Sequence, residues 1–222
     1  MLAITKNMKK IFEKIQSCIF ELILERWDEI YLYASVIQDK NNKQTGEMFF
    51  YYIPKGALFR KKPVNVYEVP RKFNINEGEY LKIVDALYEN IKELQQEFKN
   101  TNQDVWTNLS ISIAHTRFKV EFFYDEVLND KNSSYIRHVI WRYKYLHVGG
   151  EIKEEKDILE NYFKEVSMSN AKSEVYQTGL YVKSSNNLVG FDKEIEEEKI
   201  RQSEIERKEN ELQEKKRKKK KS

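Results

Sequence analysis

The sequence predicts an α+β fold, in which an antiparallel β-sheet of about five strands carries helices on one face and is followed by a charged C-terminal helical or disordered tail. Apolar residues recur with helical spacing in three segments, and segments of alternating apolar residues lie between them. Residues 192–222 hold 10 acidic and 12 basic residues and no aromatic residue. Such a segment cannot bury enough apolar surface to form a core, so its composition predicts a tail outside the folded domain.

The helices are predicted from stripes of apolar residues. The first covers residues 4–26, where apolar side chains fall three or four positions apart. A second covers residues 77–100 and begins at a capping box, in which Asn76 accepts hydrogen bonds from first-turn amides and Glu79 reaches back. A third covers residues 133–147 and ends where two consecutive glycines follow.

The strands are predicted from alternation and from β-branched and aromatic residues. Residues 29–37 and 47–53 form a hairpin across a polar turn, and residues 109–114 and 118–124 form another. A strand over residues 62–69 is assigned to a sheet edge, because it contains one proline and is followed by another.

The domain organisation follows from this order of elements. Residues 1–148 suffice for an α+β core, residues 149–191 form a C-terminal extension, and residues 192–222 form the charged tail. Within the extension, a short helix is expected over residues 153–166 and a strand over residues 174–183.

Composition excludes several function classes. The 222 residues carry a net charge of only +3, and the 7 glycines are placed so that no Rossmann fingerprint, P-loop or nucleophile elbow is present. Cys18 is the single cysteine, so an intrachain disulfide or a cysteine-based zinc site is excluded. The longest apolar runs are too short for a membrane span, and no signal peptide is recognised. The protein is therefore expected to be cytoplasmic.

No catalytic or metal-binding constellation stands out. His138 and His147 are nine positions apart and point to opposite sides of one helix, while His115 falls in a hairpin turn. The carboxylate pair Asp125 and Glu126 shows no sign of the pairing that shifts a pKa. We therefore expect a protein that is not an enzyme and has no cofactor.

A basic and aromatic segment in the third helix suggests an alternative function as a nucleic-acid-binding accessory protein. The residues that would contact phosphates and bases are Arg137, Trp141, Arg142, Lys144 and the terminal lysines. The same segment also fits an amphipathic helix with its cations in water, and we consider this interpretation the better one.

Aromatic residues are abundant, with 14 Tyr, 12 Phe and 3 Trp. They alternate along the strands and cannot all face one side of the sheet. Either some are exposed at a protein interface, where Tyr and Trp are enriched, or the sheet is covered on both faces. Trp106 poses the same question, and the neighbouring strand residues favour a core position over an interface anchor.

Six segments in order resemble the YezG/EsaG-like immunity proteins over about residues 8–148. They are WDEIYLYA at 27–34, MFFYY at 48–52, LQQEFK at 94–99, VWTNL at 105–109, VEFFYD at 120–125 and IWRYKYL at 140–146. The resemblance implies a cytoplasmic antitoxin that binds and neutralises a cognate toxin, commonly a nuclease of the LXG or type VII-secreted kind. It implies no small-molecule substrate and no membrane.

Such a function predicts aromatic anchors surrounded by charge, placed on the sheet and its loops. The expected partner-binding residues are Asp28, Glu29, Tyr33, Tyr51, Trp106, Phe123, Asp125 and Glu126. The net charge of +3 argues against simple mimicry of a nucleic-acid backbone.

Limited proteolysis is expected to remove the tail near Phe191 and to leave a folded core, because residues 192–222 lack apolar anchors. Mass spectrometry of the product locates the cut, and its thermal melt tests the fold. A product that no longer melts cooperatively would show that the tail is structural.

Overall fold

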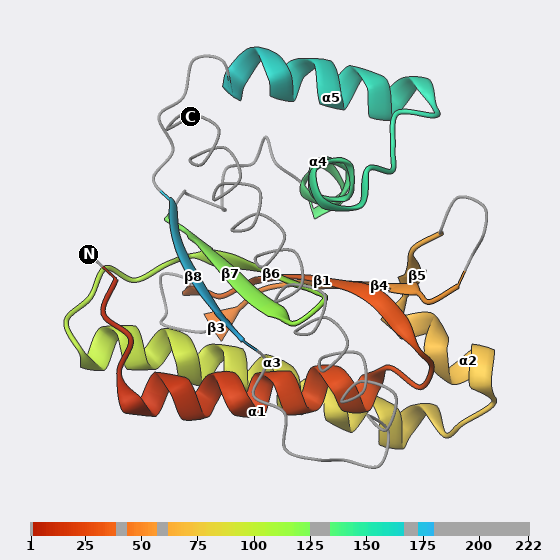
Figure 1. Ribbon diagram of the computed structural model, residues 1–222. Helices are drawn as coiled ribbons and strands as arrows, with labels where there is room; N and C mark the ends of the chain where they lie inside the picture. Colours follow the sequence, from red (N-terminus) through yellow and green to blue (C-terminus); the bar gives the residue numbers. More distant parts are fainter. Residues whose placement is uncertain (1, 39–43, 57–61, 125–133, 167–172, 180–222) are drawn as a thin grey trace, which may run out of the picture. The chain divides into compact units, whose positions relative to one another are not determined.

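The computed structural model describes residues 2–38, 44–56, 62–124, 134–166 and 173–179 (Figure 1). The chain divides into two compact units, Met1–Tyr181 and Val182–Ser222, and all described residues belong to the first. The predicted charged tail therefore lies outside the described residues.

Helices and strands follow one another in the predicted order. The helices are α1 (Lys6–Leu22), the 3₁₀ helix η1 (Val66–Glu68), α2 (Val69–Phe73), α3 (Glu77–Asn100), α4 (Ser134–Leu146) and α5 (Lys153–Val166). The strands are β1 (Trp27–Ser35), β2 (Ile37–Gln38), β3 (Gln44–Thr45), β4 (Met48–Pro54), β5 (Val64–Asn65), β6 (Asn108–Ala114), β7 (Arg117–Phe123) and β8 (Ser173–Gly179).

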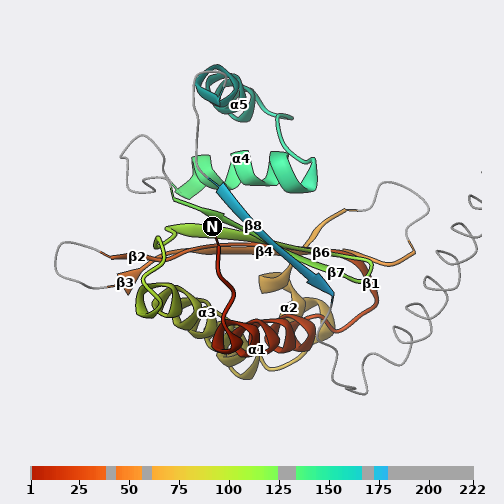
Figure 2. The ribbon, with the colours of Figure 1, turned by 60° about the vertical axis from the view of Figure 1, so that its left-hand side comes forward.

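An antiparallel sheet of six strands, in the order β5-β4-β1-β6-β7-β8, forms the middle layer. Helices α1, α2 and α3 cover one face, here called the inner face, and α4 lies on the outer face with α5 beyond it (Figures 1 and 2). The predicted α+β class is confirmed. Helix α4 also covers aromatic residues on the outer face, so of the two interpretations of the aromatic residues the structure shows the one in which both faces of the sheet are covered.

The inner face holds the main core. Thr5 caps α1, since its Oγ1 accepts a hydrogen bond from the Met8 amide at 3.0 Å. Asn76 caps α3 as predicted, because its Oδ1 accepts from the Glu79 amide at 3.0 Å. Both helices direct apolar stripes onto the sheet, and their fully buried members include Ile11, Ile15, Ile19, Leu87, Ile91, Leu94 and Phe98.

Strand β1 gives the sheet its two different faces. Its residues Ile30 and Leu32 are fully buried on the inner side, opposite Tyr52 and Phe50 of β4. The intervening residues Tyr31 and Tyr33 point to the outer side. This alternation was predicted from the sequence, and a slip of one residue would exchange the two faces.

The prediction of a strand over residues 62–69 is wrong for most of its length. Only Val64 and Asn65 pair with β4, and η1 and α2 follow at once. Asn65 ends the strand, because its Oδ1 accepts from the Tyr67 amide at 3.1 Å. Pro70 lies in the first turn of α2, where a missing amide proton costs nothing, so it starts a helix there.

Trp106 belongs to the inner core and is fully buried. Its ring meets Phe98 edge-on at 6.2 Å between centroids and lies 5.7 Å from Phe122. Gln95 fixes the adjoining backbone, because its Nε2 donates to the Trp106 and Val36 carbonyls at 2.6 and 2.9 Å. Trp106 is thus a packing residue, the role that the sequence favoured, and its ring has no exposed surface to anchor a partner.

Replacement of Trp106 by alanine is expected to lower the free energy of unfolding by about 3–5 kcal/mol, through lost burial and the cavity that remains. Denaturant unfolding measures the change. Val105→Ala is the matched control, because Val105 is 37% exposed and its loss should change stability little. An equal effect of both substitutions would contradict the buried packing of Trp106.

Candidate protein-interaction site

The eight residues predicted to bind a partner do not form one site. Tyr33 and Tyr51 lie together on the outer face, while Trp106 is buried on the inner side. Asp28 and Glu29 are half-buried near the start of β1. Phe123 ends β7, with the Lys144 ammonium 5.0 Å from its ring centroid. Asp125 and Glu126 lie outside the described residues.

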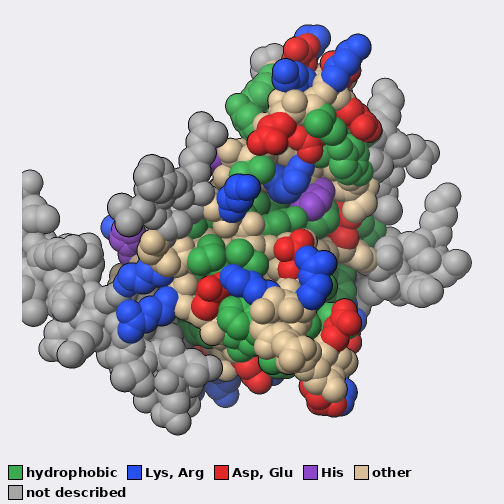
Figure 3. Space-filling model, turned by 90° about the vertical axis from the view of Figure 1, so that its right-hand side faces the viewer, with side chains coloured by type: hydrophobic (Ala, Val, Ile, Leu, Met, Phe, Trp, Pro, Cys, Tyr) green, Lys and Arg blue, Asp and Glu red, His purple; other side chains and the backbone are tan. Residues whose placement is uncertain are grey.

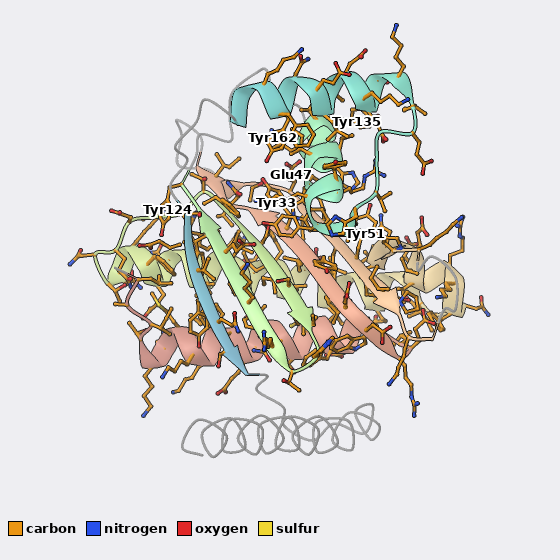
Figure 4. The ribbon with its side chains drawn as sticks, turned by 45° about the horizontal axis from the view of Figure 1, so that its top comes forward. Tyr33, Glu47, Tyr51, Tyr124, Tyr135 and Tyr162 are labelled. Carbon is orange, nitrogen blue, oxygen red and sulfur yellow. The ribbon has the colours of Figure 1, made fainter. Side chains whose placement is uncertain are left out.

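An aromatic layer joins α4 to the outer face of the sheet. Its members are Tyr33, Phe49, Tyr51, His138, Trp141 and Tyr145. His138 stacks on Phe49 at 4.4 Å between centroids, and a hydrogen bond of 2.9 Å joins its Nε2 to Tyr51 Oη. Figure 4 shows Tyr33 and Tyr51 reaching from the strands toward α4. Tyr33 has only 6% of its surface exposed, so it is largely covered and packs beneath α4.

Polar contacts at the edges of the layer fix the position of α4. Trp141 Nε1 donates to Ser110 Oγ at 3.1 Å, and Tyr145 Oη donates to Glu121 Oε2 at 3.0 Å. Glu47, just before β4, accepts from Ser134 and pairs with the Arg137 guanidinium at the start of the helix. These bonds satisfy polar groups that the layer removes from water.

Helix α5 is held to α4 through Glu155, which is 9% exposed. One of its oxygens pairs with Arg142 at 2.6 Å, and the other accepts from the Gly150 amide at 2.9 Å. The turn between the helices needs positive φ at Gly149 (128°) and Gly150 (77°), a conformation that favours glycine. The pair of helices is therefore one supported platform.

The tyrosine hydroxyls in and beside the layer have raised pKa values, which favours their neutral form. Burial raises the pKa of the Tyr33 and Tyr145 hydroxyls well above the ordinary tyrosine value, with further increases from Glu47 and Glu121 respectively. Burial, together with the Glu29 carboxylate, raises the pKa of Tyr31 to about 12. These phenols remain protonated at neutral pH, so they pack and donate hydrogen bonds.

Exposed aromatic side chains of the platform lie in contact with one another outside this layer. Tyr143 is 39% exposed and Phe163 is 49% exposed, and their rings meet edge-on at 5.6 Å between centroids. Tyr162 lies 5.5 Å from Phe163. We call these three residues the platform patch. None of these three residues is among the partner-binding residues expected from the sequence. The signal was a pair of apolar dipeptides four positions apart within α5, Ile158-Leu159 and Tyr162-Phe163.

The residues of the nucleic-acid alternative are largely engaged within the fold. Arg137 pairs with Glu47, Arg142 pairs with Glu155, and Trp141 is only 5% exposed. Lys144 lies over Phe123 and Tyr145. The indole therefore offers no open stacking surface for a base.

No metal site or membrane helix emerges from the described parts of the chain. They contain no group of three or more His, Cys, Asp or Glu side chains placed to hold a metal ion. They also contain no helix long and apolar enough to span a membrane. In Figure 3, acidic and basic side chains are interspersed with hydrophobic ones over the face in view, so that face carries no large patch of one charge.

The stability of the fold is expected to fall below pH of about 6.5 through His138. Burial and the Arg142 charge lower its pKa, although Glu47 and Glu155 act in the opposite direction. Because the folded state prefers the neutral imidazole, its contribution is complete above the unfolded-state pKa and is lost as pH falls toward the folded-state pKa. Unfolding free energies from pH 7 to 5 should decline more for the parent protein than for His138→Gln. Parallel pH profiles would contradict this assignment.

The comparison with known proteins covers most of the described fold. The model of the family "Immunity protein YezG-like" matches residues 8–160, which include every element from α4 back to β1 and most of α1 and α5. The chain is 29% identical to the immunity protein YezG of Bacillus spizizenii over 161 residues, which are 72% of this chain and 95% of the relative.

Two further relatives agree. Immunity protein YezG of Bacillus subtilis is 28% identical over 156 residues, 70% of this chain and 98% of its own length. The type VII secretion system protein EsaG of Staphylococcus aureus is 25% identical over 167 residues, 72% of this chain and 96% of its own length. The resemblance seen in the sequence is confirmed, and this chain belongs to the YezG-like immunity protein family.

Proposed function

We propose that this protein binds and neutralises a cognate secreted toxin in the cytoplasm, and that the platform patch is the centre of the contact. The family is one of immunity proteins, so the chain acts without enzymatic activity of its own. The type VII secretion assignment of the relative EsaG, together with the resemblance, favours a secreted nuclease as the toxin.

The observation that carries the choice of surface is the contact between Tyr143 and Phe163. Aromatic side chains that are half exposed and grouped are the usual anchors of protein interfaces, since they bury large areas with little loss of side-chain entropy. The predicted anchors Tyr33 and Trp106 are at most 6% exposed and would require unpacking to meet a partner. They support the fold, whereas the patch offers its surface as it stands.

Charge on the platform fits a protein partner better than a polyanion. Among the side chains that the structure describes on α5, the exposed charges are balanced, with Lys153, Lys156 and Lys164 against Glu154, Asp157 and Glu160. A balanced rim around an apolar centre resembles a standard protein interface. Neutralisation then works by occluding or distorting the toxin, since the exposed charged side chains that the structure describes on α5 are of both signs.

The double substitution Tyr143→Ala with Phe163→Ala is expected to weaken toxin binding by about 2 kcal/mol or more, roughly 30-fold. Its melting temperature should change little, because both side chains are substantially exposed. Secreted toxins encoded by neighbouring genes are screened by co-expression for protection, and affinity is then measured by calorimetry against the toxin that the parent protein neutralises.

Tyr67→Ala is the matched control, since Tyr67 is an aromatic residue of similar exposure, 42%, on η1 away from the platform. It should bind as the parent does. Full binding by the double variant would reject the platform patch while leaving the function intact. Failure of the parent protein to bind or protect would reject the function itself.

A further inference from the structure

We propose that β8 is a guard strand, which occupies the outer edge of β7 and thereby prevents β7 from pairing with β7 of a second copy of this chain. Strand β8 lies beyond residues 8–160, the part that matches the family model. Within that matched part, β7 is the last strand of the sheet. An uncovered edge of this kind is a template for pairing with another chain.

Strand β8 covers the whole edge. It pairs with all seven residues of β7, from Arg117 opposite Gly179 to Phe123 opposite Ser173. Tyr176 stacks on Phe12 of α1 at 4.7 Å between centroids, which closes the core below the edge. The outward residues of β8 are exposed, with Val175 at 50%, so the strand is held from one face only.

The β7 sequence is complementary to itself in the antiparallel direction. When two copies pair about Val120, each Lys119 lies opposite Glu121 of the other copy, and each Phe118 lies opposite Phe122. All seven residues find a partner, and the apolar residues of both copies stay on the inner side, because the pairing keeps the alternation in phase. Opposite charges and aromatic pairs across strands are both stabilising. The resulting contact has two-fold symmetry.

Strand β8 gives β7 no such charge pairs. Lys119 lies opposite Gln177 and Glu121 lies opposite Val175, so the two charges pair with each other along their own strand, at 3.2 Å. The second copy is therefore the occupant that the charges of β7 fit best. Strand β8 nevertheless outcompetes a second copy for the edge of β7, because it belongs to the same chain and therefore has a high effective concentration there.

The test releases β8 in the full-length chain. Tyr176→Pro combined with Thr178→Pro removes two amide protons and the stacked ring, and proline cannot donate a hydrogen bond to the ladder between β8 and β7. Amide exchange should show that residues 173–179 are freed, and light scattering after size exclusion should show a doubled mass relative to the parent protein. The control, Tyr176→Phe with Thr178→Val, keeps the strand and should keep the parent mass.

Charge exchange on β7 then identifies the interface. Adding Lys119→Glu to the proline variant places glutamates opposite each other and should return the mass to that of the parent. Adding both Lys119→Glu and Glu121→Lys restores opposite charges and should restore the doubled mass. Because Glu121 also accepts a hydrogen bond from Tyr145, Tyr145→Phe in the proline variant is the control and should keep the doubled mass. Freed β8 amides without a change in mass, or a doubled mass that ignores both charge changes, would overturn the proposal.

Discussion

The outward-facing aromatic side chains of β1 and β4 must be covered, and the positions of α4 and α5 depend on that requirement. Tyr33 and Phe49 stack at 5.0 Å between centroids, and an uncovered row of such rings would expose a large apolar surface. Helix α4 removes that surface from water by placing His138 and Trp141 on the row. The position of α5, and of everything displayed on it, follows from that contact.

The packing of α4 on the sheet engages several charged side chains, and this determines which charged groups remain available to bind a partner. Glu47 and Glu155 each hold an arginine of α4, and Glu121 accepts a hydrogen bond from Tyr145. Glu47 and Glu155, which are paired with arginines in this way, position the helices and no longer form a free field around the molecule. The basic and aromatic side chains of α4 therefore mostly make contacts within the fold. Phe163, an exposed aromatic residue, lies on the neighbouring helix α5.

Local patterns made much of the fold predictable. Helical stripes, the Asn76 cap and the alternation along β1 each depend on residues close together in the chain, so α3 and the first hairpin could be assigned directly. Pro70 was misjudged, since the same residue ends a strand or begins a helix according to its neighbours. The family resemblance also followed from short segments in order, which survive at 29% identity.

The sequence by itself determined the fold class, the inner faces of the helices and strands, and membership of an immunity protein family. Tertiary structure alone decided which aromatic residues of the outer face are covered. The contact between Arg137 and Glu47 joins residues 90 positions apart, and no periodicity within either segment encodes it. Burial of Tyr33 and exposure of Phe163 both depend on that packing, because an aromatic side chain becomes core or interface according to what lies on it.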